Sequence, residues 1–348
     1  MLVFIMNKLL RRLILLICFV LTACSDNDIY YYEDVDLYDE CGNQIYYRNP
    51  VTSFDFPDPT IIRSEDGYFY TMSTSSRYEG NMVHLPMMRS KDLINWEFLG
   101  SALSADANIG NYVTALWAPD VNYINNQYVL YVATFSGSIY TCEIIVLTSD
   151  SPDGPYIKQG VLITPQKARG IVCIDPELHI CDDGKLFLYF GSGMIGCIEL
   201  TSDGMSIKDG VTLNTFTFNM EGTYIYKNDQ YYYIFGSRGL FYKPDYHIVT
   251  ARATNLFEEF VDDRGDRLSD SGGTEIMTNS EYFWGVGHNG EVLKDDSGRY
   301  WICYHSYFKK YGDKIRPMMI SRLNWNANGW PVVGDPKIIN EMPYWEKK

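Results

Sequence analysis

Five polar residues that can carry acid–base or ligand chemistry recur at one place in a repeated sequence unit. They are Asp58, Asp120, Asp175, Glu221 and His288. In each unit the polar residue is followed by a short strand pattern, a tight turn of mostly Asp, Asn and Gly residues, and an apolar strand. Carboxylates and imidazoles are the side chains that most often act as general acids and bases. Equivalent units would bring these five side chains together.

The unit that begins at Asp175 shows the pattern most clearly, because its turn is Asp182-Asp183-Gly184 and its apolar strand runs from Leu186 to Phe190. The five leading residues are 62, 55, 46 and 67 positions apart. A period of about fifty residues with several strands per unit is typical of β-propeller blades. No segment shows a sustained helical period. We therefore predict an all-β, five-bladed β-propeller whose inner strands line a central channel, with blades near 54–104, 112–165, 170–218, 219–272 and 281–339.

Three of the predicted channel residues, Asp58, Asp175 and Glu221, are sufficient for acid–base hydrolysis of a glycosidic bond. One carboxylate activates water, one carboxylic acid protonates the leaving oxygen, and a third raises the pKa of the acid through like-charge interaction. Single acids near turns are usually solvated or cap a turn. Three acids at the same phase of a repeat favour a shared site instead.

The motifs around these residues resemble those of family 43 glycoside hydrolases. The matching stretches are Pro57-Asp58-Pro59-Thr60, Trp117-Ala118-Pro119-Asp120, Ile174-Asp175-Pro176, Glu221-Gly222 and Gly287-His288. The resemblance covers residues 54–335, and it implies a five-bladed propeller that hydrolyses arabinose- or xylose-containing glycans with inversion. It also implies that Asp58 is the general base, Glu221 the general acid, and Asp175 the residue that modulates the pKa of the acid.

Within that family, the later blades are most similar to those of endo-α-1,5-arabinanases. The similar stretches are Phe190-Gly191-Ser192, Tyr246-His247-Ile248-Val249, Gly272-Gly273-Thr274, Tyr304-His305-Ser306 and Asn328-Gly329-Trp330-Pro331. The family's substrate contacts then correspond to Trp117, Asp120, Phe135, Ser192 and His305. Arg316 either faces the channel, to steady a carboxylate or a sugar hydroxyl, or points outward from its strand. Three positions depart from the family's usual residues: Pro57, Thr223 and Val286.

Two other functions stay open at this point. An exo-acting α-L-arabinofuranosidase or β-xylosidase of the same family would use the same carboxylates in a blocked cleft. A non-catalytic, surface glycan-binding propeller would keep the aromatic residues and lose the acids, and here all three acids are present. Loop length around the channel mouth separates endo from exo action.

His288 is the candidate metal ligand. The resemblance implies a calcium ion beside it in the channel, whereas calcium chemistry favours oxygen ligands, so a hydrogen-bonding histidine is the alternative. No organic cofactor is expected. Residues 191–196 fit the pattern G-x-G-x-x-G, but a strand pattern follows them in place of the helix that dinucleotide binding requires.

The N-terminus carries a targeting segment. Three basic residues precede an apolar run, Leu13–Leu21, that is shorter than the ~18–20 residues of a membrane span. Leu21-Thr22-Ala23-Cys24 resembles a bacterial lipoprotein box, which predicts a signal peptide over 1–23, lipidation of Cys24, a tether over 24–50 and a propeller over 51–348. The acidic run at 25–28 is either a surface-export signal or a plain tether. We predict a lipoprotein on the outer membrane of a Gram-negative bacterium, exposed at the cell surface.

Charge restricts the partners. The formal net charge is −15, and removal of a signal with three basic residues and no acids leaves −18. Such a protein repels nucleic acid and polyanionic glycans, so we expect a neutral pentose-containing polysaccharide or oligosaccharide, contact with the membrane through the lipid only, and a monomer. The six cysteines after Cys24 mostly lie in apolar strands, which favours buried free thiols over disulfides.

Overall fold

The computed structural model describes residues 37, 44, 46–104, 107–110 and 113–341. The described residues from 44 to 341 belong to one compact unit. The predicted signal peptide and Cys24 lie outside the described residues, as does Cys41. No helix among the described residues is long and apolar enough to span a membrane.

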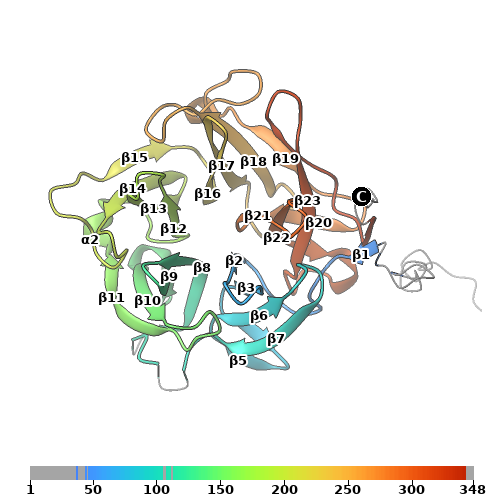
Figure 1. Cartoon of the computed structure of the whole chain (residues 1–348), viewed down its shortest axis with the longest axis horizontal. Coiled ribbons are helices and arrows are strands. Elements are labelled where there is room, and N and C mark those ends of the chain that lie inside the picture. Colours follow the sequence, from blue (N-terminus) through green and yellow to red (C-terminus); the bar gives the residue numbers. More distant parts are fainter. Residues whose placement is uncertain (1–36, 38–43, 45, 105–106, 111–112, 342–348) are drawn as a thin grey trace, which may run out of the picture. The chain divides into compact units, whose positions relative to one another are not determined.

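Five antiparallel sheets stand around a central channel, which confirms the predicted five-bladed propeller (Figure 1). Blade 1 contains β2 (Thr60–Arg63), β3 (Phe69–Met72), β6 (Pro86–Ser90) and β7 (Trp96–Ser101). Blade 2 contains β8 (Ala115–Ile124), β9 (Gln127–Phe135), β10 (Glu143–Ser149) and β11 (Ile157–Ile163). Blade 3 contains β12 (Glu177–Ile180), β13 (Leu186–Ser192), β14 (Met194–Leu200) and β15 (Asn214–Thr217).

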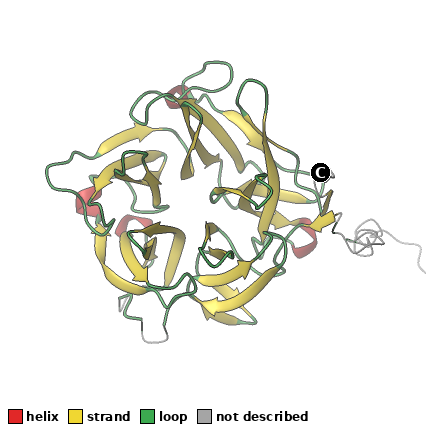
Figure 2. Ribbon diagram, in the orientation of Figure 1, coloured by secondary structure: helices red, strands yellow, loops and turns green. Residues whose placement is uncertain are grey.

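Blade 4 contains β16 (Glu221–Asn228), β17 (Tyr231–Arg238), β18 (His247–Ala253) and β19 (Thr274–Met277). Blade 5 contains β20 (Phe283–Gly287), β21 (Val292–Lys294), β22 (Tyr300–Phe308), β23 (Met318–Trp325) and β24 (Pro331–Val333). A small hairpin, β4 (Ser76–Tyr78) with β5 (Asn81–Val83), extends from blade 1. The helical turns are short: η2 (Ile139–Thr141), α2 (Pro165–Ala168), η3 (Leu268–Asp270) and η4 (Lys309–Tyr311) (Figure 2).

The blades hold together through apolar layers between neighbouring sheets. Tyr70, Leu85, Leu130 and Ile145 pack between blades 1 and 2, and Phe190 belongs to the layer between blades 2 and 3. Side chains of alternate strand positions fill these layers because both faces of each blade meet another blade. Cys142, Cys173, Cys181, Cys197 and Cys303 are free, and all but Cys181 are buried, as the apolar strand pattern predicted.

The ring closes at blade 5. Strand β1 (Tyr46–Arg48) pairs with β25 (Ile339–Glu341), and Tyr47 packs edge-on against Trp301. Buried Asn49 donates to the Ile320 carbonyl at 2.7 Å and accepts the Ile320 N–H at 3.0 Å. The chain that enters blade 1 therefore runs along β23, and part of the predicted tether, residues 46–50, belongs to this closure.

One backbone feature repeats at the head of every blade. Asp58, Ala118, Asp175, Gly222 and His288 each have a positive φ, between 44° and 56°. Each lies just before or early in the inner strand of its blade, so it turns the chain from the rim into the channel. Residues other than Gly rarely adopt this conformation, and when they do the surroundings impose it. In blade 2 the repeating position is therefore Ala118, and our alignment of Asp120 with Asp58 and Asp175 was wrong by two residues.

Candidate active site

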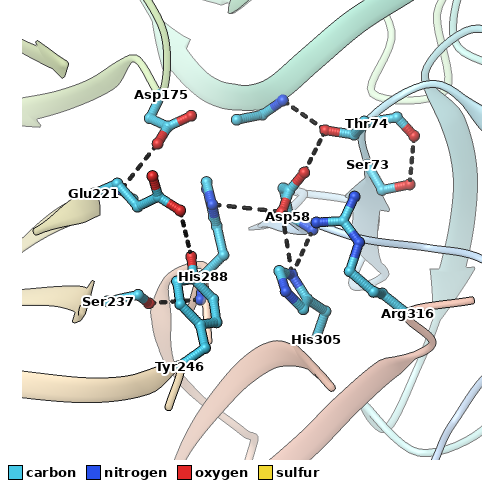
Figure 3. A network of polar contacts seen from close by, with 12 residues as sticks. Asp58, Ser73, Thr74, Asp175, Glu221, Ser237, Tyr246, His288, His305 and Arg316 are labelled. Atoms are coloured by element: carbon cyan, nitrogen blue, oxygen red, sulfur yellow. Dashed lines mark hydrogen bonds and ion pairs between the residues drawn. The ribbon is translucent and has the colours of Figure 1, made fainter. Parts of the chain in front are cut away.

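Asp58 lies directly before β2 and is buried at the channel mouth (Figure 3). Its Oδ2 accepts a hydrogen bond from Thr74 Oγ1 at 2.7 Å. Its Oδ1 lies 3.3 Å from Arg316 Nη1, 3.1 Å from His305 Nδ1 and 3.4 Å from His288 Nδ1. Burial alone would raise the pKa of Asp58, but Arg316 and the two histidines outweigh burial and hold that pKa well below its usual range. Asp58 is therefore ionised and can accept a proton.

Asp175 occupies the matching position in blade 3. It is buried, and its Oδ2 accepts the Gly222 N–H at 3.0 Å. Burial raises its pKa to about 7; His288 opposes that rise, and the negative charges of Glu221 and Asp58 add to it. The negative charge of Glu221 therefore favours the protonated form of Asp175.

Glu221 is the first residue of β16 and is half-buried. Its Oε1 accepts a hydrogen bond from Tyr246 Oη at 2.9 Å, and its Oε2 accepts one from Ser192 Oγ at 3.1 Å. These two donors fix the carboxyl between blades 3 and 4. Figure 3 shows Asp175 and Glu221 on one side of His288 and Asp58 on the other.

The histidines position the other groups. The His288 N–H donates to Ser237 Oγ at 2.7 Å, and a Cβ at Gly222 would come within 3.0 Å of the His288 ring. Glycine therefore suits position 222 for two reasons: a side chain would crowd the His288 ring, and the φ angle is positive. His305 is fully buried and stacks on Tyr246 with ring centroids 5.9 Å apart. Burial lowers the pKa of His305 to about 4, so its imidazole is neutral.

The predicted substrate contacts fall into three groups. Ser192 and His305 contact the carboxyls of Glu221 and Asp58, and Arg316 faces the channel, not the outside. Trp117 and Phe135 stack on each other at the top of blade 2 with centroids 4.0 Å apart, and both keep exposed surface.

Asp120 differs from the expectation, because it lies one layer deeper than the catalytic candidates. Its Oδ2 accepts the Leu178 N–H at 2.9 Å and a hydrogen bond from Asn122 at 2.6 Å. Two other acids, the buried Glu177 and the half-buried Glu291, line the same cavity. Burial raises the pKa of Asp120 to about 7 and that of Glu291 to about 8, and it raises the pKa of Glu177 well above its usual range. Like-charge repulsion adds to burial for Glu177 and Glu291, so this layer holds protons near neutral pH.

Sequence reasoning missed Thr74 and Tyr246, which hold the carboxyls of Asp58 and Glu221. A signal for Thr74 exists: a hydroxyl residue ends the second strand of every unit. These residues are Thr74, Thr134, Ser192, Ser237 and Ser306. Three of the five bond a residue at the channel mouth, namely Asp58, Glu221 or His288. Tyr246 lies in a loop of blade 4, and nothing in the repeat marks it.

The channel around His288 is the candidate metal site. Among the described residues, no group of three or more His, Cys, Asp and Glu side chains is arranged to hold an ion. The channel cavity lined by His288 does contain three buried oxygen atoms without a hydrogen-bond partner in the described part of the chain, Glu177 Oε2, Thr223 Oγ1 and Asn289 Oδ1. Oxygen atoms of this kind are what calcium prefers.

A propeller with an ionised carboxylate and two further carboxyls around one channel mouth has the groups needed for acid–base hydrolysis of glycosidic bonds. The profile described as "Glycosyl hydrolases family 43" matches residues 47–331. The chain belongs to this family and is a glycoside hydrolase, which confirms the resemblance noted in the sequence.

Three known proteins illustrate the similarity. The "Probable arabinan endo-1,5-alpha-L-arabinosidase A" of Aspergillus flavus is 28% identical over 82% of this chain and 94% of its own length. The "Extracellular exo-alpha-(1->5)-L-arabinofuranosidase ArbA" of Cellvibrio japonicus is 24% identical over 82% of this chain and 88% of its own. The solved "GH43 Endo-Arabinanase from Bacillus licheniformis" is 27% identical, with a TM-score of 0.68 over 80% of this chain and 98% of its own.

We expect Asp120→Asn to make the free energy of unfolding less dependent on pH. Folded Asp120 has a pKa of about 7, whereas an unfolded Asp titrates near ~3.9. The folded state therefore binds the extra proton between these values, and the stability that the proton contributes is complete below about pH 4 and is lost as the pH rises through about 7. Urea unfolding from pH 4.5 to 8, with chelator present, measures the slope. The exposed Asp209→Asn is the control, and a slope as steep in Asp120→Asn as in wild type would show that Asp120 is already ionised.

Proposed function

We propose that the chain hydrolyses α-1,5 linkages inside neutral arabinan, as an inverting endo-arabinanase. The observation that carries the proposal is the gathering of Asp58, Asp175 and Glu221 around one channel mouth in a family 43 chain. The arabinan-specific names of the relatives support the substrate, and the net charge of −15 favours an uncharged glycan.

In this proposal Asp58 is the general base. Its low pKa, which Arg316, His288 and His305 maintain against burial, keeps the carboxylate ionised and oriented. A water molecule beside Asp58 attacks the anomeric carbon and passes a proton to the carboxylate as the carbon–oxygen bond forms. Thr74 donates a hydrogen bond to Oδ2 of Asp58, which fixes the orientation of the carboxylate. The other oxygen, Oδ1, lies near Arg316, His288 and His305.

Glu221 is the general acid, and Asp175 keeps a proton available to it. As the glycosidic bond breaks, Glu221 gives its proton to the leaving oxygen. Asp175 accepts a hydrogen bond from the N–H of Gly222, the residue after Glu221, and this bond keeps its carboxyl group close to Glu221. Base and acid come from blades 1 and 4, which are not adjacent in the ring (Figure 1). This placement favours the wider carboxyl separation of an inverting enzyme, about 6.5–9.5 Å, in which water fits between base and sugar.

Linear arabinan tests both the substrate and the mode of action. We expect an early spread of oligosaccharides, and proton NMR of the first product should show an inverted anomeric configuration. Monosaccharide alone from the first minutes would establish the exo alternative, and a retained configuration would remove Asp58 from the base role.

Glu221→Gln is the matched variant for this experiment. It should abolish cleavage of arabinan while sparing an aryl arabinoside, because an activated leaving group needs little protonation. Equal losses on both substrates would exclude Glu221 as the acid. A wild-type protein that binds arabinan without cleaving it would instead favour the glycan-binding alternative.

We also propose that His288 holds a calcium ion in the channel. The support is the set of three oxygen atoms, of Glu177, Thr223 and Asn289, that have no hydrogen-bond partner among the described residues and lie in the cavity that His288 lines. A bound ion would add positive charge there, and we assign no step of hydrolysis to it. Metal content of the purified wild type and of His288→Ala, measured by plasma mass spectrometry, tests the assignment. Equal calcium in both proteins would contradict it.

The cellular location of the protein is a separate proposal. We propose that Cys24 is lipidated and that the enzyme faces outward from the outer membrane of a Gram-negative cell, on the strength of Leu21–Cys24 and the acidic run that follows. Cys24→Ala should move the protein from the membrane fraction to the soluble fraction. Intact cells that shield wild-type protein from added protease would disprove the outward orientation.

A further inference from the structure

Beside Glu221, at blade 3, the channel is bordered by a very short loop. The loops that join the second and third strands of each blade form the rim of the channel, and in blade 3 a single residue, Gly193, separates β13 from β14. The corresponding connection in blade 4 spans residues 239–246. Gly193 is tied to the segment that leads into Glu221, because it donates to the Met220 carbonyl at 2.9 Å and accepts the Asn219 N–H at 3.0 Å. The turn at Gly193 therefore forms a short, fixed surface next to Glu221, which we call the floor.

A cavity of about 340 Å³ opens over this floor. It is lined by Ser192, Asn219, Glu221, Arg238 and Leu240, among others. Its volume lies in the range of small-ligand pockets, about 300–1,000 Å³. Because Glu221 forms part of its wall, the cavity lies on the side of the scissile bond to which the acid gives its proton. That assignment rests on the proposed function.

The lining has the chemistry of a site for a neutral sugar. The two terminal guanidinium nitrogens of Arg238 donate to the carbonyls of Ser271 and Phe218. Asn219 is exposed and has a φ of 49°, a conformation that Asn tolerates better than most residues. Leu240 lines the cavity and is 50% exposed, and the next two residues of the loop, Phe241 and Tyr242, are 42% and 50% exposed. Three consecutive large apolar side chains at a channel mouth are typical of a binding surface.

We propose that Asn219 and the loop 239–242 bind the arabinose unit on the leaving-group side of the bond that is cut. The Asn219 amide reaches a sugar hydroxyl, and Leu240 covers the C–H face of the unit. Phe241 acts differently, because its ring lies 4.9 Å from the Arg316 guanidinium, and it is therefore a positioning residue for the group that holds Asp58. The same loop therefore contacts both the proposed leaving-side sugar, through Leu240, and Arg316, the residue that holds the proposed base Asp58, through Phe241.

Two single variants test this surface. Asn219→Gly removes the amide and still tolerates the positive φ, and Leu240→Ala trims the apolar wall. We measure kcat/KM for an arabino-oligosaccharide and for an aryl arabinoside, whose leaving group contains no sugar. Each variant should lower the ratio of the first value to the second about three- to tenfold, which corresponds to the loss of one hydrogen bond or a small apolar contact. Ile157→Ala, 59% exposed on β11 at the outside of blade 2, is the control.

The outcomes separate this inference from the proposed function. A wild-type ratio in both variants, with a normal melting temperature, overturns the leaving-side surface and leaves the arabinanase proposal standing. Equal losses on both substrates also overturn it, because the loop would then act through the catalytic groups. A wild-type enzyme that cleaves the aryl arabinoside and no arabino-oligosaccharide overturns both proposals.

Discussion

The structure depends on side-chain hydrogen bonds that link neighbouring blades at four of the five junctions around the channel mouth. Thr74 of blade 1 bonds Asp58 and also accepts the Ala118 N–H of blade 2 at 2.8 Å. Asp175 of blade 3 accepts the Gly222 N–H of blade 4. Ser237 of blade 4 accepts the His288 N–H of blade 5, and His305 of blade 5 faces the Asp58 N–H at 3.2 Å. At these four junctions a side chain of one blade accepts the N–H of the strained residue that begins the next.

These hydrogen bonds explain why strain and chemistry coincide. A positive φ in a residue other than Gly costs on the order of 1–3 kcal/mol, and it persists only where neighbours impose it. At Asp58, Ala118 and His288 a side chain of the neighbouring blade imposes this conformation by accepting the N–H of the strained residue. The same turn directs Asp58, Asp175 and His288 to the mouth of the channel. Asp120, Glu177 and Glu291 line the cavity below them, and burial raises the pKa of each of these acids.

Much of the fold was readable from the sequence because each blade repeats a polar residue, a turn and an apolar strand. The turn at Asp182-Asp183-Gly184 and the strand after it were predicted within a residue or two. The phase of blade 2 was not, because Pro119-Asp120 imitates Pro57-Asp58, whereas the left-handed position belongs to Ala118. Alanine carries no sequence signal for such a conformation. Tyr246 was missed for a similar reason: only the folded loop of blade 4 brings its hydroxyl to Glu221.

Ring closure is coupled to the catalytic base. Arg316 and Asp58 are separated by 258 residues, and the contact between them exists only when blade 5 meets blade 1. The segment that enters blade 1 makes that meeting specific: Asn49 pairs with Ile320, Thr52 accepts the Met318 N–H, and Asp55 accepts the Arg316 N–H at 2.6 Å. The backbone of Arg316 is therefore fixed by residues just before Asp58. A propeller that failed to close would lose this contact, and with it a main cause of the low pKa of Asp58. In this protein the bonds that complete the fold also set the charge state of the group proposed to activate water.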